Sequence, residues 1–336
     1  MKEEIYEPGL DKDYLAKIRV LDKPRRGGLG FGIAGVVPPG VSPLTGGPRF
    51  DLDRVKKLME GAIDNHVHSA PDPYMARIGD QIDLAIDACQ AGMGGITFGE
   101  PHQVPSSYLQ AQTQKVVNQW ADEHGKRRID VFGGVSLNYA VGGLNPAAVL
   151  TSARIGGKIV WTPGVDSSHF HKLLGVPGGI DVLDKNDKVL PAMKEILGLI
   201  AEGDLVLNMS CLGVKEVFYL IDEAKKIGVK RMNVVHPNQS TSLMTVEQRK
   251  IAADKGASIE MTCVNFIPPN FSWDDFMETY KLVGPDKIIC GSDNGEFDFY
   301  TPVVAFRAFI TGMLTRDIPD QDVEKMVKTN ARKLLY

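Results

Sequence analysis

Short β-rich runs alternate with helix-length segments from about residue 50 to the end of the chain. The runs expected to form strands are 62–66, 95–99, 130–136, 158–161, 205–209, 232–236, 258–262 and 287–290. Helical patterns cover 81–91, 107–124, 146–155, 191–202, 214–227, 246–255, 273–283, 302–314 and 321–335. This alternation implies parallel βαβ units, and eight such units close a (β/α)8, or TIM, barrel. A doubly wound open sheet is the alternative, which the number of strands does not exclude.

The first 50 residues differ from the rest of the chain. Segments 25–32 and 36–50 are rich in Gly and Pro and have no sustained period, which is typical of an irregular arm. The segment GLGFG (28–32) neither follows a strand nor opens a helix, so it is not a dinucleotide-binding loop. We expect an arm over 1–50 and one barrel domain over 51–336. Because the arm has no evident partner within one barrel, we predict that it packs across a neighbouring subunit of a homo-oligomer.

Composition excludes several classes of protein. The formal net charge is −4, without the basic patch that nucleic-acid binding requires. The chain has neither a polybasic anchor nor an apolar run long enough to span a bilayer. Its four cysteines form no CxxC pair, so neither a zinc ribbon nor a disulfide framework is implied. The N-terminus lacks the apolar region of a signal peptide. We therefore expect a cytoplasmic protein with a small-molecule substrate.

The clearest chemical signal is GAIDNHVHS (61–69), where a strand ends in His66-Val67-His68. Side chains two apart on a strand point to the same face, so both imidazoles aim into one space at the carboxyl end of the strand. Active sites of barrels lie at this end, and neutral imidazole is a common ligand for zinc and similar metals. By itself, an HxH pair is also consistent with two surface histidines.

Other strands end in residues of the same chemistry. His236 ends the sixth strand in RMNVVHP, and Asp293 follows the eighth strand in KIICGSDNGEF. Of the seven histidines, at least four lie at carboxyl ends of strands: His66, His68, His102 and His236. The carboxyl ends of barrel strands share one rim. The sequence therefore predicts a metal site formed by residues that are distant along the chain.

With these residues in place, the sequence resembles the amidohydrolase superfamily of metal-dependent hydrolases over roughly residues 55–335. Within that superfamily it is similar to an uncharacterised bacterial branch, through GAIDNHVHSAPDP, AGMGGITFGEPH, SLNYAVGGLNPAAV, KIVWTPGVD and VVHP. The resemblance implies a (β/α)8 barrel and a metal held by His66, His68, His236 and Asp293. It says less about the reaction, because one fold and metal frame host many chemistries.

Two positions depart from the pattern of the superfamily. The fifth strand usually carries a His, but here Cys211 lies nearest that place. Thiolate is a good zinc ligand, so Cys211 could replace imidazole, or it could be a small apolar residue at a strand end. A bridging carboxylated Lys or a Glu commonly follows the fourth strand, which here ends in Trp-Thr-Pro (161–163). Glu100 and His102, at the end of the second strand, could supply ligands instead; in the resembling branch a Lys and a His tend to occupy these positions.

Substrate contacts are assigned to four further residues. Arg77, after the first strand, could clamp a carboxylate or phosphate or form a surface salt bridge. Asn138, just past the third strand, could bind substrate or form a turn. His169 and His171 form a second HxH in the long connection 162–190, a length often found in lids, although loop histidines are the simpler interpretation.

The resemblance implies hydrolysis of an amide, lactam or ester bond in a small molecule, with C–N bonds other than peptide bonds favoured. Metal-activated water would attack, Asp293 would orient it and accept its proton, and the metal or Arg77 would polarise the carbonyl. The cofactor is a divalent metal, with zinc first and manganese or iron as alternatives. One ion is expected if nothing bridges, and two if Glu100 does.

Three other functions stay open. Some members of the superfamily decarboxylate aromatic acids with one metal that orients the substrate. A phosphoesterase of the histidinol-phosphatase type also opens with HxH, although the Gly-Ser-Asp293 ending favours the amidohydrolase frame. Loss of the His on the fifth strand could also indicate a barrel that binds a ligand without turning it over.

Overall fold

The computed structural model describes residues 51–99, 105–267 and 270–336. Residues 51–336 form one unit by their internal contacts. The predicted arm (1–50) lies outside the described residues, as do Glu100 and His102. No helix in the described ranges is long and apolar enough to cross a bilayer.

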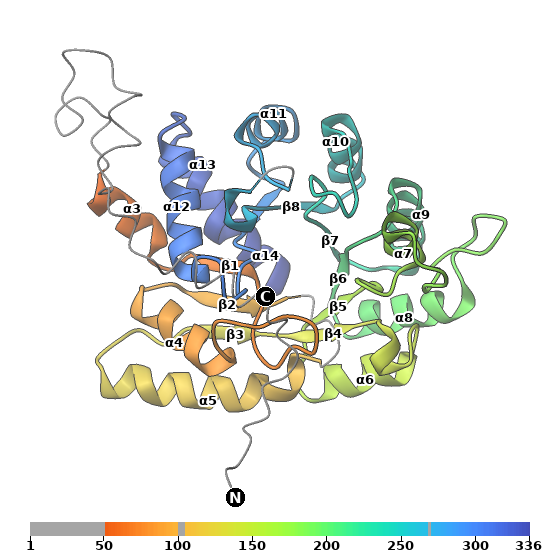
Figure 1. Cartoon of the computed structure of the whole chain (residues 1–336), viewed down its shortest axis with the longest axis horizontal. Coiled ribbons are helices and arrows are strands. Elements are labelled where there is room, and N and C mark those ends of the chain that lie inside the picture. The colour runs from red at the N-terminus through yellow and green to blue at the C-terminus, as the bar shows by residue number, and fades with distance from the viewer. Residues whose placement is uncertain (1–50, 100–104, 268–269) are drawn as a thin grey trace, which may run out of the picture. The chain divides into compact units, whose positions relative to one another are not determined.

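All the strands run parallel within two sheets. The first sheet contains β1 (Ile63–Val67), β2 (Gly95–Phe98) and β3 (Asp130–Phe132). The second contains, in order, β4 (Gly134–Ser136), β5 (Ile159–Trp161), β6 (Val206–Met209), β7 (Arg231–Val235), β8 (Ser258–Thr262) and β9 (Ile288–Gly291). The helices lie around the strands (Figure 1). The α/β class with parallel strands, predicted from the alternating pattern, is confirmed.

The strand predicted over 130–136 is divided by Gly133 into β3 and β4. Strand β3 pairs with β2 and strand β4 pairs with β5, so this one segment contributes a strand to each sheet. The Ser106 hydroxyl lies at the division: it accepts the backbone N–H of Gly134 at 3.0 Å and donates to the carbonyl of Phe98 at 2.8 Å. A Cβ on residue 133 would lie 3.0 Å from Ser106 Oγ. A glycine therefore allows the close approach of Ser106 to the strand.

The helices agree with the predicted segments except in three places. They are α3 (Leu52–Met59), α4 (Gln81–Gln90), α5 (Ser107–Glu123), α6 (Pro146–Arg154), α7 (Ser168–Leu174), α8 (Pro191–Glu202), α9 (Val214–Ile227), α10 (Val246–Asp254), α11 (Trp273–Val283), α12 (Pro302–Leu314), α13 (Asp320–Glu324) and α14 (Asn330–Leu335). Helices α3 and α7 were not predicted. The helix expected over 321–335 is interrupted by a π-helical turn, Lys325–Thr329.

Contacts between β1 and β9 bring the two outer strands together. Beyond the strand ends, Asp293 N–H donates to the carbonyl of His66 at 2.8 Å, and His68 N–H donates to the carbonyl of Asn294 at 2.9 Å. Inward side chains of β1, β5, β6, β7 and β9 meet in one buried cluster with α14: Ile63, Ile159, Trp161, Val206, Val235, Ile289, Ala331, Leu334 and Leu335. In the described part of the chain the strand ladders form two sheets, and one isolated parallel bridge, between Val67 and Asn294, connects the end of β1 to the chain just after β9.

Candidate metal centre

The carboxyl end of β1 carries His66 and His68 into the interior. The pairing of β1 with β2 shifts register between Asp64 and Val67, and all five residues of the strand are buried. His66 is 1% exposed. Glycine makes room for its ring, because a Cβ on Gly99 would lie 2.9 Å from Cδ2 of His66.

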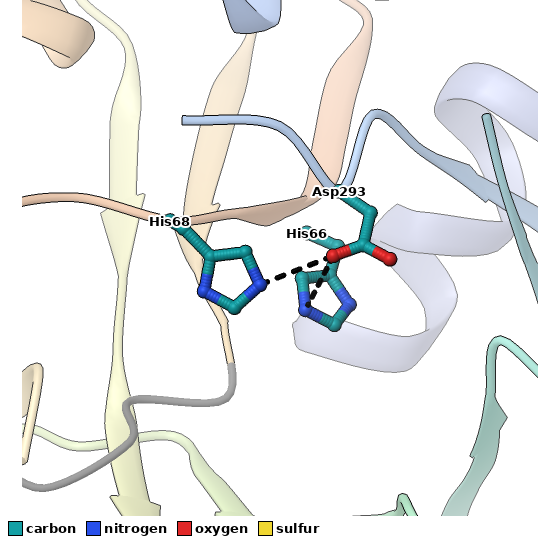
Figure 2. Close-up of side chains that lie close together, drawn as sticks. All are labelled: His66, His68 and Asp293. Atoms are coloured by element: carbon teal, nitrogen blue, oxygen red, sulfur yellow. Dashed lines mark hydrogen bonds and ion pairs between the residues drawn. The ribbon is translucent and has the colours of Figure 1, made fainter. Parts of the chain in front are cut away.

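Asp293 meets both histidines through one oxygen. Its Oδ1 lies 3.1 Å from Nε2 of His68 and 3.5 Å from Nε2 of His66 (Figure 2). One ligand atom from each of the three residues lies within 4.8 Å of the others. This spacing would allow the three groups to contact one ion. The convergence predicted from residues at positions 66, 68 and 293 is therefore present in the fold.

The other oxygen of Asp293 is held by uncharged donors. Asp293 Oδ2 accepts the side-chain amide of Gln239 at 2.5 Å and the hydroxyl of Thr262 at 3.2 Å. Burial favours the protonated carboxyl group, but His66, His68 and other nearby imidazoles outweigh it and hold the pKa of Asp293 well below its ordinary value. Burial lowers the pKa of His68, against the raising effect of its hydrogen bond to Asp293. The site therefore presents an ionised carboxylate.

A buried glutamate on β8 contacts His66 from behind. Glu260 is 0% exposed, and its Oε1 lies 2.8 Å from Nδ1 of His66. Its Oε2 accepts the side-chain amide of Asn233 at 2.7 Å and also that of Asn65. The sequence analysis did not identify this residue. Its only sequence signal is one acidic residue inside the otherwise uncharged strand SIEMT (258–262).

His236 lies next to the three-residue group without joining it. Its ring centroid is 5.6 Å from that of His66, and the tight group within 4.8 Å comprises only His66, His68 and Asp293 among the described residues. Its ring nitrogens lie 3.3 Å from the hydroxyl of Ser210 and 3.3 Å from that of Thr241.

Cys211 follows β6 and is also buried. Its thiol accepts the hydroxyl of Ser210 at 3.5 Å, and its carbonyl accepts the hydroxyl of Ser167 at 2.6 Å. Cys211, which the sequence analysis named in place of the usual fifth-strand histidine, is thus linked to His236 through the hydroxyl of Ser210.

Three of these residues have an unusual backbone. The φ angle is 51° at Cys211, 34° at His236 and 55° at Asp293. Positive φ in this range is uncommon for residues other than glycine. Each of the three residues lies just past the end of a strand. The chain therefore turns sharply at the residues that carry these candidate site side chains.

Arg77 is bound on all sides of its guanidinium group. Its Nε and Nη2 donate to Asp72 at 2.9 and 2.5 Å, and its Nη1 donates to Glu296. The side chain is 0% exposed. In this structure Arg77 therefore joins the loop after β1 to the loop after β9.

The other proposed substrate contacts lie in the loops after β4 and β5. Asn138 accepts the backbone N–H of Gly164 at 3.0 Å. His169 and His171 lie on α7, a helix that the sequence analysis treated as a loop. The ring of His171 donates from Nδ1 to the carbonyl of Pro177 at 3.1 Å. These contacts connect neighbouring loops at the carboxyl ends of the strands.

A small recess of about 30 Å³ adjoins His68. It lies between the loop after β1 and the start of α5, and its lining includes His68, Asp72, Gln81 and Phe98.

The fold is similar to that of several solved enzymes, including an amidohydrolase, as the sequence resemblance implied. An amidohydrolase from Pseudomonas aeruginosa matches with a TM-score of 0.60 and 14% identity, covering 84% of this chain and 97% of its own. The probable dipeptidase PvdM from the same organism matches at 0.58 and 12%, covering 86% and 98%. A 2,6-dihydroxybenzoate decarboxylase in complex with 2,6-dihydroxybenzoate matches at 0.51 and 12%, covering 82% and 99%.

The class defined by fold and site is therefore an α/β protein with a fold similar to that of a solved amidohydrolase and with a buried His–His–Asp group. Within it, the chain belongs to DUF6282, a family of unknown function whose profile matches residues 61–260. No curated protein sequence matches the chain significantly.

Proposed function

We propose that this protein is a metal-dependent hydrolase whose divalent cation is held by His66, His68 and Asp293. The observation that carries the proposal is the approach of these three groups to within 4.8 Å of one another. Imidazole and carboxylate are ligands that zinc accepts, and three protein ligands are the usual number in a catalytic zinc site. Zinc is the first candidate, with manganese or iron as alternatives. When bound, such a cation supplies Lewis acidity and lowers the pKa of water.

The protein side chains would position the carboxylate of Asp293, transfer the proton of the water molecule and complete the site. Gln239 and Thr262 hold Oδ2 of Asp293, which leaves Oδ1 directed toward the histidines. An ionised carboxylate in this place can orient a water molecule, accept its proton and pass it to the leaving group. His236, buried beside His66, would either complete the ligand set or contact the substrate.

The substrate is proposed to be a small molecule with an amide, lactam or ester bond, bound beside His68. Glu100, His102 and Cys211 are candidates for further ligands if a second ion binds. We also propose that the two sheets function as one (β/α)8 barrel, because β1 and β9 are in contact.

Elemental analysis of the purified full chain tests the metal site. We expect about one equivalent of metal in the wild type and its loss in a His66→Ala/His68→Ala double variant. His124→Ala is the matched control, because His124 is exposed and stacks on Trp120 at the end of α5. A double variant that keeps its full metal content would refute the site.

A substrate panel tests the reaction. Amides, lactams, esters and phosphoesters are assayed for hydrolysis, and aromatic acids for release of carbon dioxide. The second arm is included because the fold is shared with a decarboxylase. Metal-dependent hydrolysis that is lost in Asp293→Asn supports the proposal. Release of carbon dioxide without hydrolysis would replace it with a decarboxylase at the same site.

A further inference from the structure

A buried polar contact lies next to the three candidate ligands of the metal centre. Glu260 on β8 is fully buried and has a hydrogen bond to His66, one of those ligands. A buried carboxylate needs partners to be stable. Here it has three: the Nδ1–H of His66 and the side-chain amides of Asn65 and Asn233.

The direction of each bond follows from the chemistry of the groups. A carboxylate oxygen accepts hydrogen bonds, so Nδ1 of His66 donates in this contact. In a neutral imidazole, a hydrogen on Nδ1 leaves the lone pair on Nε2. Nε2 is the nitrogen that lies 3.5 Å from Asp293. The contact with Glu260 therefore selects the tautomer in which the nitrogen facing Asp293 can bind a metal.

The amides hold Glu260 in turn. Asn233 on β7 uses its side-chain NH₂ twice, toward Glu260 at 2.7 Å and toward the oxygen of Asn208 at 3.1 Å. The carboxylate is thus fixed from β1 and from β7 at once. A partner held in this way defines the rotation of the imidazole ring as well as its tautomer.

Resting on the proposed metal-dependent function, we propose that Glu260 is the positioning residue of the site, which sets the orientation and tautomer of His66 for metal binding. It contacts neither the substrate nor the ion. Hydrogen-bond partners of metal-ligating histidines typically change metal affinity by about 10- to 100-fold when removed.

The first test measures Zn²⁺ affinity of the full chain by competition with a chromophoric chelator. Glu260→Leu removes the acceptor, and we expect binding about 10- to 100-fold weaker. Glu260→Gln retains an oxygen that can accept from Nδ1, so it should recover part of the affinity. The matched control is Ser152→Ala, which removes a buried hydrogen bond between α6 and α5 outside the network of His66 and Glu260 and should bind Zn²⁺ as the wild type does. Equal Zn²⁺ affinity in a folded Glu260→Leu variant would overturn the proposal.

The second test needs no metal. Two-bond ¹H–¹⁵N correlation spectra of histidine-labelled apoprotein distinguish the two tautomers, and the chain has only seven histidines to resolve. The signals of His66 are identified by their absence in His66→Asn. We expect the Nδ1–H form in the wild type and its loss in Glu260→Leu. A wild type in the Nε2–H form overturns the inference, even where Glu260→Leu fails to fold.

The two tests also separate this inference from the proposed function. A wild type that binds no Zn²⁺ but shows the Nδ1–H form of His66 refutes the metal centre and upholds the orienting contact. A wild type that binds Zn²⁺ while Glu260→Leu binds it equally well refutes the role of Glu260 and upholds the metal centre.

Discussion

A rise in pH from 5 to 8 should destabilise the metal-free protein through one buried carboxyl group, that of Asp64 in β1. Asp64 is 2% exposed. Its Oδ1 accepts the backbone N–H of Ser292 at 2.8 Å and that of His66 at 3.3 Å. Its Oδ2 has no hydrogen-bond partner among the described residues. Burial raises the pKa of Asp64 to about 7, because the hydrogen bonds from Ser292 and His66 offset desolvation only in part.

The sign and size of the effect follow from proton linkage. Between the ordinary pKa of 3.8 and about 7, the folded protein keeps a proton that the unfolded chain has released. The free energy of unfolding therefore falls as pH rises through this window and levels off above it. Since one pKa unit corresponds to about 1.4 kcal/mol, the full effect is about 4 kcal/mol, of which about 3 kcal/mol falls between pH 5 and pH 8.

Asp64→Asn isolates this effect, because asparagine keeps an acceptor oxygen but cannot ionise. Urea unfolding in the presence of EDTA gives the free energy of unfolding of variant and wild type at both pH values. We expect the variant to gain about 3 kcal/mol relative to the wild type on going from pH 5 to pH 8. Glu278→Gln is the control, because Glu278 lies at an exposed position of α11. Its free energy of unfolding should differ from that of the wild type by the same amount at pH 5 and at pH 8. The reasoning would be refuted if the free energy of unfolding of Asp64→Asn also differed from that of the wild type by the same amount at both pH values.

Three further changes test the supports of the site. Gln239→Leu removes the amide donor to Asp293 and should weaken Zn²⁺ binding about tenfold or more in chelator competition. Arg77→Met leaves two buried carboxylates without their shared cation and should lower the free energy of unfolding by about 3–5 kcal/mol in urea. Gly295→Ala would place a Cβ 1.9 Å from the carbonyl oxygen of His68, at a φ of 148°; it should lower stability by about 2 kcal/mol or more and reduce bound metal.

Each of these expectations has a result that contradicts it. Unchanged Zn²⁺ affinity in Gln239→Leu would show that the ion does not depend on how Asp293 is held. A free energy of unfolding in urea within about 1 kcal/mol of the wild-type value for Arg77→Met would mean that water replaces the lost cation. Full metal content in Gly295→Ala would show that the loop after β9 can move without disturbing His68.

The order of elements was predictable because periodicity reports burial directly. Strands such as 258–262 and helices such as 191–202 have the bounds expected from their patterns. The division of the third strand was not predictable, because it depends on Ser106 packing against Gly133, a contact between distant segments. The π-helical turn at Lys325–Thr329 likewise has no local signal: its sequence continues the helical pattern on both sides.

Part of the site was predictable for a similar reason. His66, His68 and Asp293 end strands whose carboxyl ends share one edge, so the topology alone brings them together. The role of Glu260 was not visible, because one acidic residue in a strand has no meaning until its partner on another strand is known. Arg77 shows the same limit: the sequence left a substrate clamp and an ion pair open, and the fold supplies two carboxylates as its neighbours.

The left-handed turns at Cys211, His236 and Asp293 have a practical consequence for engineering. A non-glycine residue in that conformation costs about 1–2 kcal/mol, which glycine would avoid. Glycine would also remove the side chain and its contacts, such as the hydrogen bonds of Asp293 with Gln239 and Thr262. A variant selected for heat resistance alone can therefore lose a residue of the candidate site. Screens of this protein should couple survival on heating to retention of bound metal.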